Sequence, residues 1–158
     1  MIGEVTKDLR TASREPESAV GESFEGLVVW QKARELMLFV HKKVVPLLPV
    51  EEKWDLANQI RRSSKSVKSN SAEAHGRFHY RDAMRFCYQS RGSLSETENH
   101  LIDALDLGYV PLPLYQEGRD LAKLVQRLLN GYIHYLKQKK PGAGELTAEI
   151  PTAPITDH

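Results

Sequence analysis

Residues 59–77 concentrate side chains that could bind phosphate groups. Their sequence is QIRRSSKSVKSNSAEAHGR, and the aromatic and basic run FHYR follows directly. Residues 61–91 contain eight lysines or arginines and only two acids, whereas the whole chain has a net charge of +1. Lysine and arginine neutralise backbone phosphates, and aromatic rings stack on unpaired bases. This stretch is therefore the first candidate for a nucleic-acid-binding surface.

The candidate binding residues are the basic side chains of this stretch and the aromatic ones beside them. They are Arg61, Arg62, Lys65, Lys68, Arg77, Phe78, Tyr80, Arg81 and Arg85. The chain lacks the signatures of known RNA-binding modules, so the hypothesis depends on charge and aromatic content. The alternative is structural, because Arg61 or Arg62 could form an ion pair inside the fold or across subunits. Glu73 and Glu96 are the expected partners, since a carboxylate on a buried helical seam is costly unless it is paired.

No group of residues in the sequence indicates catalysis, a metal or a cofactor. His75 and His79 have a spacing that suits zinc, but Gly76 interrupts their helix and no third ligand is clustered with them. Neither Glu73 nor Glu96 begins the Glu-x-x-His pattern of carboxylate-bridged metal bundles. Cys87 falls on a helical seam, which favours core packing over reactivity. We expect a protein that is not an enzyme and holds no metal.

The composition predicts one soluble domain in the cytoplasm. A chain of 158 residues with 41% hydrophobic residues can bury a core. One cysteine excludes an internal disulfide framework and fits a reducing compartment. The sequence has no apolar run of the roughly 20 residues that a membrane span needs, and no signal peptide is recognisable.

Charge and composition divide the chain into three parts. Residues 24–140 have a net charge of +6, whereas residues 1–23 and 141–158 have net charges of −2 and −3. Proline, glycine and small polar residues without apolar periodicity predict that both terminal segments are disordered. The basic central domain suggests an anionic partner, and the simpler role for the acidic tails is to aid solubility.

Apolar periodicity predicts four helices at about 25–45, 51–76, 80–106 and 112–140. Pro46 and Pro49 end the first helix, and Gly76 ends the second. Gly108 and Pro111 separate the last two helices. With short connections and no strand signal, the fold class is all-α, an antiparallel up-down four-helix bundle with disordered tails.

The periodicity also predicts which side chains meet in the core. For the first helix the expected face is Leu27, Trp30, Ala33, Met37, Val40 and Val44, with a second stripe of Val29, Leu36 and Phe39. For the last helix the expected seam is Leu114, Leu121, Leu124, Leu128, Tyr132 and Tyr135. The expected seam of the third helix is Ala83, Cys87, Ser90, Leu94, Thr97, Leu101 and Ala104. The expected seam of the second helix is Ala57, Ile60, Ser64, Val67, Ser71 and Ala74. This second seam is apolar at first and then rich in serine, which indicates close packing or a polar task for the hydroxyls. The wide apolar arc of the first helix suggests contact with another subunit.

Three segments together resemble a known family. FEGLVVWQKARELM, QIRRSSKSVKSNSAEAHGR and FCYQSRGSLSETENHLIDALDLGYV resemble the four-helix-bundle proteins encoded within intervening sequences of bacterial 23S ribosomal RNA genes. The resemblance covers residues 24–137, in order and in register. Ser63 and Ser64 stand where the family has alanines and Ala74 where it has glycine, which makes the seam of the second helix more polar and could lengthen that helix by a turn.

The resemblance implies a bacterial protein that assembles as a homopentamer. A related bundle, the accessory protein of diversity-generating retroelements, binds a reverse transcriptase and nucleic acid. The resemblance therefore implies self-association and, as partners, RNA or DNA and a reverse transcriptase or other nucleic-acid enzyme. Two hypotheses follow: nucleic-acid binding through the basic surface of the second helix, or a protein-interaction scaffold assembled through the first two helices.

Overall fold

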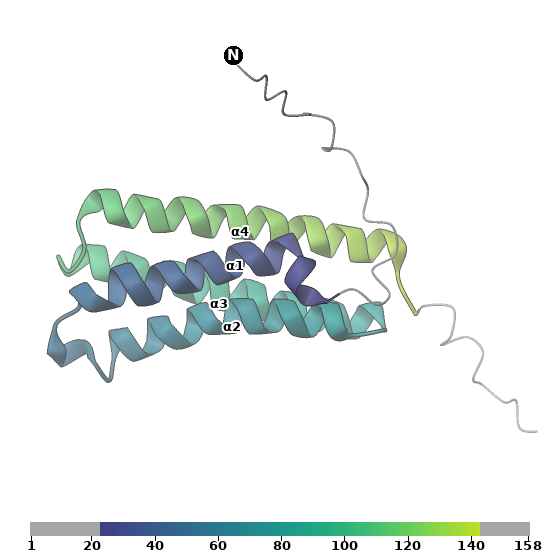
Figure 1. The fold of residues 1–158 in the computed structure, drawn as a ribbon, viewed down its shortest axis with the longest axis horizontal. Helices are drawn as coiled ribbons and strands as arrows, with labels where there is room; N and C mark the ends of the chain where they lie inside the picture. The colour runs from purple at the N-terminus through teal and green to yellow at the C-terminus, as the bar shows by residue number, and fades with distance from the viewer. Residues whose placement is uncertain (1–22, 143–158) are drawn as a thin grey trace, which may run out of the picture.

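The four predicted helices form one bundle. A computed structural model describes residues 23–142, and these residues contain helices but no strand. The long helices are α1 (Val28–Phe39), α2 (Leu56–Gly76), α3 (Tyr80–Asp106) and α4 (Leu112–Lys139). Consecutive helices run in opposite directions (Figure 1). Helix α1 packs against α2 and α4, and α3 packs against the same two helices. The all-α prediction is confirmed.

The predictions for the terminal segments fall on residues 1–22 and 143–158, which lie outside the described part of the chain. None of the helices within residues 23–142 is both long and apolar enough to cross a membrane.

Helix α1 is shorter than predicted because its last turns change type. The Ser23 hydroxyl accepts a hydrogen bond from the Glu25 amide at 3.3 Å and caps a 3₁₀ turn, Phe24–Gly26, before α1 begins. After α1 the backbone continues as a π-helix, Val40–Val44, and a 3₁₀ turn, Val45–Leu47. Pro46 lies in that last turn and ends the helical segment, as the sequence predicted.

The serine-rich seam of α2 packs against α3 through hydrogen bonds. All of its predicted members are buried: Ala57, Ile60, Ser64, Val67, Ser71 and Ala74. The Thr97 hydroxyl donates to Ser63 Oγ at 2.9 Å, and Ser90 Oγ donates to the Val67 carbonyl at 2.8 Å. Ser71 Oγ lies 3.1 Å from Ser90 Oγ. The hydroxyls thus bond within the α2–α3 interface of one chain, so this seam is not open to a partner.

The structure confirms part of the predicted core of the first helix and corrects the register of α4. Both predicted stripes of the first helical segment contribute buried residues, which are Ala33, Val40 and Val44 from the first and Val29, Leu36 and Phe39 from the second. Leu27, Trp30 and Met37 of the predicted first face are only half-buried. In α4 the buried residues are Gly118, Ala122, Val125, Leu129, Ile133 and Leu136, and the predicted seam is half-buried beside them.

The physical reason for the α4 register is the close approach of Phe39 to Gly118. A Cβ atom placed on Gly118 would lie 2.6 Å from Cε1 of Phe39, so only glycine accommodates this ring. This contact turns the stripe that begins with Gly118 and Ala122 toward the core, and the predicted seam lies at the edges of the helix. Both apolar stripes of α4 recur with the helical period, so periodicity alone does not choose between them.

The loops at one end of the bundle are tied to each other. The Tyr109 hydroxyl, after α3, donates to Glu52 Oε1 at 3.0 Å, in the connection between α1 and α2. Glu52 Oε2 accepts from the Leu56 amide at 3.1 Å and so caps α2. Gly108 has a φ of +76°, which glycine adopts without strain, and α3 ends two residues earlier at Asp106.

Candidate functional site

The structure divides the predicted binding residues among three places. Arg61, Lys65 and Lys68 lie on the side of α2 that faces α1, whereas Arg62 lies on the side that faces α3. The remaining residues lie at the turn between α2 and α3 and on the first turns of α3: Arg77, Phe78, Tyr80, Arg81 and Arg85. One helical turn contains 3.6 residues, so adjacent arginines point about 100° apart.

The first place is the α1–α2 cluster, which consists of His41, Arg61, Lys65 and Lys68. His41 lies in the π-helical segment after α1. Its pKa is lowered from the ordinary 6.5, first by burial and then by the positive charges of Lys65, Arg61 and Lys68, although a hydrogen bond with the backbone of Arg61 acts in the opposite direction. The positive charges of all three cations therefore act on the imidazole.

The cations of the α1–α2 cluster form no ion pair with the described part of the chain. Among residues 23–142, no carboxylate lies within the 4.0 Å of an ion pair from Arg61, Lys65 or Lys68. Arg61 Nε donates to the Ala57 carbonyl at 3.2 Å, which holds its guanidinium along α2. Arg61 and Lys68 are half-buried and Lys65 is exposed. Positive charge without a protein counter-ion is available to an anion.

The second place is the α2–α3 groove, which carries both signs of charge. It is lined by Gln59, Arg62, Ser63, Ser66, Glu96, Asn99 and His100. Glu96 and Arg62 face the same space, and His100 Nδ1 lies 4.0 Å from Asp103 Oδ2. An anion in this groove would meet a carboxylate as well as an arginine, so the electrostatic attraction is weaker than in the α1–α2 cluster.

The third place is the end of the bundle where α2 turns into α3. Arg77 Nη2 forms an ion pair with Glu73 Oε2 at 3.0 Å, and its guanidinium lies 4.6 Å from the centre of the Phe86 ring. Arg85 lies 5.1 Å from the same ring. The contact with Arg81, which donates to the Tyr80 hydroxyl at 3.5 Å, lowers the pKa of Tyr80.

The predicted ion pairs of Arg61 or Arg62 with Glu73 or Glu96 do not form in this chain. Glu73 pairs with Arg77 instead, four residues on along the same helix face. Glu96 has no ion pair among the described residues. Both carboxylates are exposed and neither lies on a buried seam, so no buried charge has to be compensated.

Cys87, which the sequence places on a helical seam, lies in the core. Cys87 is fully buried, and burial raises the pKa of its thiol to about 12, so it is core packing as predicted. Among residues 23–142, no group of three histidine, cysteine or acidic residues is arranged to hold a metal ion.

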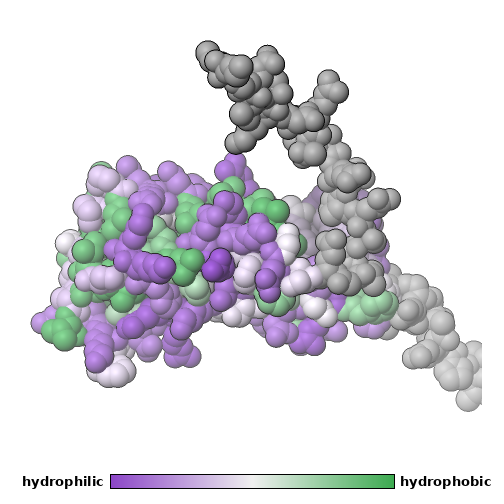
Figure 2. Space-filling view, viewed as in Figure 1, coloured by the Kyte–Doolittle hydropathy of each residue, from purple (hydrophilic) through white to green (hydrophobic). Residues whose placement is uncertain are grey.

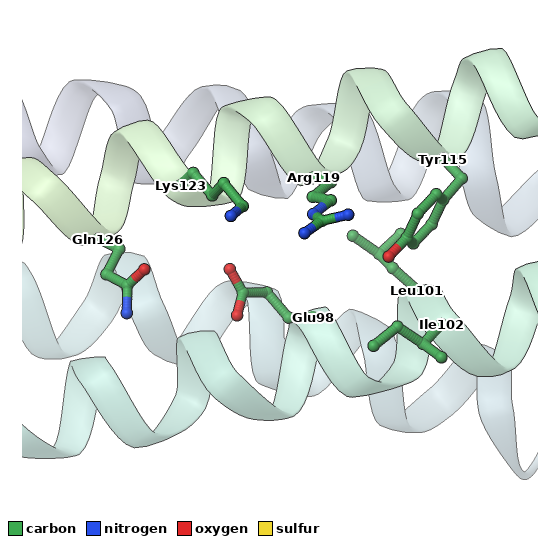
Figure 3. Close-up of a pocket in the computed structure, with 7 residues that line it drawn as sticks. All are labelled: Glu98, Leu101, Ile102, Tyr115, Arg119, Lys123 and Gln126. Atoms are coloured by element: carbon green, nitrogen blue, oxygen red, sulfur yellow. The ribbon is translucent and has the colours of Figure 1, made fainter.

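A second groove, between α3 and α4, also mixes charges. Figure 3 shows Arg119 and Lys123 from α4 pointing toward Glu98 of α3, with Tyr115 and Ile102 at one end. The charges face one another without the 4.0 Å contact of an ion pair. Positive and negative charges therefore lie together in this groove, as they do in the α2–α3 groove.

The sequence did not reveal three of the residues at these places. His41 lies outside the basic stretch and joins the α1–α2 cluster only because α1 packs on α2. Phe86, which Arg77 and Arg85 contact, and Tyr88, which Arg91 contacts, lie within α3. Only the spacing of three residues between Tyr88 and Arg91 was a usable signal, because residues three apart are neighbours on a helix surface and adjacent ones are not.

Comparison with known proteins supports both the fold and the family. The sequence model for 23S rRNA-intervening sequence proteins matches residues 25–131. Among solved structures, the chain is similar to the crystal structure of a protein of unknown function from the S23 ribosomal protein family of Bacteroides thetaiotaomicron VPI-5482. The two share 24% sequence identity with a TM-score of 0.61, over 68% of this chain and 96% of that one, which supports the fold. No curated protein matches the chain.

Proposed function

Because the chain belongs to the family of 23S rRNA-intervening sequence proteins, we propose that it is a non-enzymatic protein that binds nucleic acid through phosphate contacts. The observation that carries this proposal is the α1–α2 cluster. Three cations near enough to lower the pKa of one histidine have no carboxylate partner among the described residues. Such a cluster attracts phosphate oxygens and releases counter-ions when they bind.

The end of the bundle where α2 turns into α3 carries further positive charge. Arg77, Arg81 and Arg85 surround the turn between α2 and α3, and α4 brings Lys137, Lys139 and Lys140 to the same end. Figure 1 shows the last turns of α4 beside this turn, and the Tyr80 amide donates to the Pro141 carbonyl at 2.9 Å. A polyanion could therefore contact the cluster and the end of the bundle together.

The experiment is a salt titration of nucleic-acid binding. A fluorescein-labelled DNA duplex of about 20 base pairs would be titrated by fluorescence anisotropy at several salt concentrations. Each phosphate contact contributes about 0.9 to the slope of log affinity against log salt for duplex DNA, so replacing Arg61, Lys65 and Lys68 with glutamine should reduce the slope by about 3. Absence of binding at low salt, or binding that does not weaken with salt, would refute the proposal.

The matched control removes equal charge from another surface. Arg119→Gln, Lys123→Gln and Arg127→Gln on α4 change the net charge by the same amount, and all three side chains are exposed. Arg119 and Lys123 face Glu98 rather than the α1–α2 cluster (Figure 3). If the α4 triple variant loses as much slope as the α2 variant, binding follows net charge and not the cluster.

A second candidate function is self-association, and it depends on an apolar groove between α1 and α4. The groove is lined by Gly26, Leu27, Val28, Val29, His75, Leu128, Tyr132 and Tyr135. Burial raises the pKa of Tyr132 to about 12, while Val28 remains 51% exposed. Figure 2 shows hydrophobic side chains interrupting the hydrophilic surface over α1 and α4. We propose that a second copy of the chain covers this face, within the homopentamer that the family resemblance implies.

The native mass tests this assembly. Val28→Asp places a charge in the groove and should reduce the mass in sedimentation velocity to that of the monomer. Ile102→Asp is the matched control, because Ile102 is 43% exposed on α3 and lies outside the groove. A wild-type protein that sediments as a monomer would rule out self-association without affecting the proposal on nucleic acid.

A further inference from the structure

The first half of α3 presents arginine and tyrosine on one exposed stripe. Arg81, Arg85 and Tyr88 are spaced at i, i+4 and i+7, so they lie along one face, and Arg91 follows one turn later. All of them are exposed, and Tyr88 is 42% exposed. We call these residues the outer α3 stripe.

Arginine side chains lie close to the aromatic rings of this region. Arg91 lies 4.9 Å from the centre of the Tyr88 ring, and Arg77 and Arg85 lie 4.6 and 5.1 Å from the centre of Phe86. These contacts hold the arginines in place before a ligand arrives, which reduces the conformational entropy lost on binding.

The charges of the stripe are available to a ligand. Among the described residues, Arg81, Arg85 and Arg91 form no ion pair. Phe78, in the turn that precedes α3, adds a ring that is 56% exposed. The surface therefore offers two exposed aromatic rings beside uncompensated positive charge.

Exposed rings distinguish unpaired from paired nucleic acid. In a duplex the bases stack on one another and the backbone faces outward, so a flat aromatic ring on a protein surface gains little. In a single strand the bases are free to stack on aromatic side chains and on arginine planes.

We propose that the outer α3 stripe, with Phe78, is a binding surface for single-stranded nucleic acid. Bases stack on Tyr88 and Phe78, and phosphates contact Arg81, Arg85 and Arg91. This inference rests on the proposed function, adds a second contact surface on α3 and names the class of nucleic acid that binds there.

The opposite end of the bundle provides an internal comparison. Lys53 lies 5.0 Å from the centre of the Trp54 ring, and Trp54 is 81% exposed. Glu51, Glu52 and Asp55 adjoin this pair in sequence, so phosphate is repelled there. An aromatic ring beneath a cation is thus not sufficient to bind a phosphate backbone. The outer α3 stripe differs from this pair because fewer acidic residues adjoin it in sequence.

The test compares two fluorescein-labelled probes, a thymidine single strand of about 20 nucleotides and a duplex of the same length, by fluorescence anisotropy at one salt concentration. The wild-type protein should bind the single strand more tightly. Tyr88→Leu should weaken single-strand binding by about five- to 150-fold, the range of one base–aromatic stack, and leave duplex binding unchanged. Tyr88→Trp should preserve single-strand binding, since it keeps an aromatic ring. A uridine strand repeats the test for RNA.

Trp54→Leu is the matched control, because it removes an exposed ring that lies beside a cation at the opposite end of the bundle. It should change neither the affinity for the single strand nor the affinity for the duplex. Tyr88 is at the surface, so its variants should melt at the wild-type temperature in circular dichroism. Equal affinity for both probes, with no effect of Tyr88→Leu, overturns this inference and leaves the proposed function standing. Loss of binding to both probes in the wild type overturns both.

Discussion

The two sides of α2 differ in how their positive charges are balanced. Arg61 and Arg62 are neighbours in sequence, yet one joins the α1–α2 cluster with His41 and the other faces Glu96 across the α2–α3 groove. The first side has positive charge with no acidic partner among the described residues, and the second mixes acids, amides and hydroxyls. The neighbouring arginines of α2 are therefore divided between two sides of the helix, and of these two sides the one that faces α1 suits a polyanion better.

The sharpest way to break this comparison is to reverse the charges of the first side. Arg61→Glu, Lys65→Glu and Lys68→Glu together should weaken duplex binding by about 100-fold or more, because like charges facing a phosphate cost several kcal/mol. Fluorescence anisotropy at low salt measures the loss. Weakening of less than about threefold would mean that phosphates bind elsewhere, with the end of the bundle as the next place to test.

The hydroxyl-bonded side of α2 should respond in stability instead of binding. Ser90→Ala removes the hydrogen bonds of Ser90 with the Val67 carbonyl and with Ser71, and should lower the free energy of unfolding by about 1 kcal/mol. Thermal melting should then fall by about 2–8 °C, while affinity for nucleic acid stays constant.

Ser95→Ala is the control for this change, since Ser95 is exposed and its hydroxyl bonds only to the Arg91 carbonyl of its own helix. An equal loss of stability in both variants would show that the α2–α3 interface gains nothing specific from its buried hydroxyls.

The α1–α2 cluster should also make binding sensitive to pH through His41. Burial and the three cations lower the pKa of His41 below 6.5, so the free protein resists its protonation. A bound phosphate would neutralise those cations and raise this pKa, so protons are taken up on binding and affinity rises as the pH falls below 6.5. Anisotropy titrations between about pH 7.5 and 5 should show this increase in the wild type and a smaller one in His41→Gln.

His41 should also make the stability of the free protein depend on pH. A fall in pH lowers this stability, whereas it raises the affinity for nucleic acid. Because the pKa of His41 is lower in the folded chain than in the unfolded chain, the unfolded chain binds more protons below pH 6.5. Its contribution to stability is therefore complete above pH 6.5 and is lost as the pH falls. Melting curves without nucleic acid should show a steeper acid-induced loss in the wild type than in His41→Gln.

The smallest effect is expected on the other side of α2. Arg62→Gln should change the salt slope of duplex binding by less than about 0.5, because Arg62 shares its groove with Glu96 and is not available for a full phosphate contact. A decrease near 0.9 would show that Arg62 contacts phosphate as Arg61 does, and the comparison between the two sides would fail.

The sequence alone determined the number of helices, the bounds of α3 and the seams of α2 and α3. These follow from local causes, because Gly76 and Gly108 lie where helices end, Pro111 precedes the first residue of α4, and the 3.6-residue period marks a buried face. The family resemblance was also carried by local motifs, and the matching of residues 25–131 confirms it.

Only the tertiary structure decided which apolar stripe of α4 faces the core and how the basic residues are grouped. Helix α4 has two apolar stripes, and the fit of Phe39 against Gly118 selects between them. Likewise, a charge pattern does not state which neighbouring helix each side of α2 will meet. His41 joins Arg61, and Glu96 joins Arg62, because packing brings together residues that are distant in sequence, and no local period records that pairing.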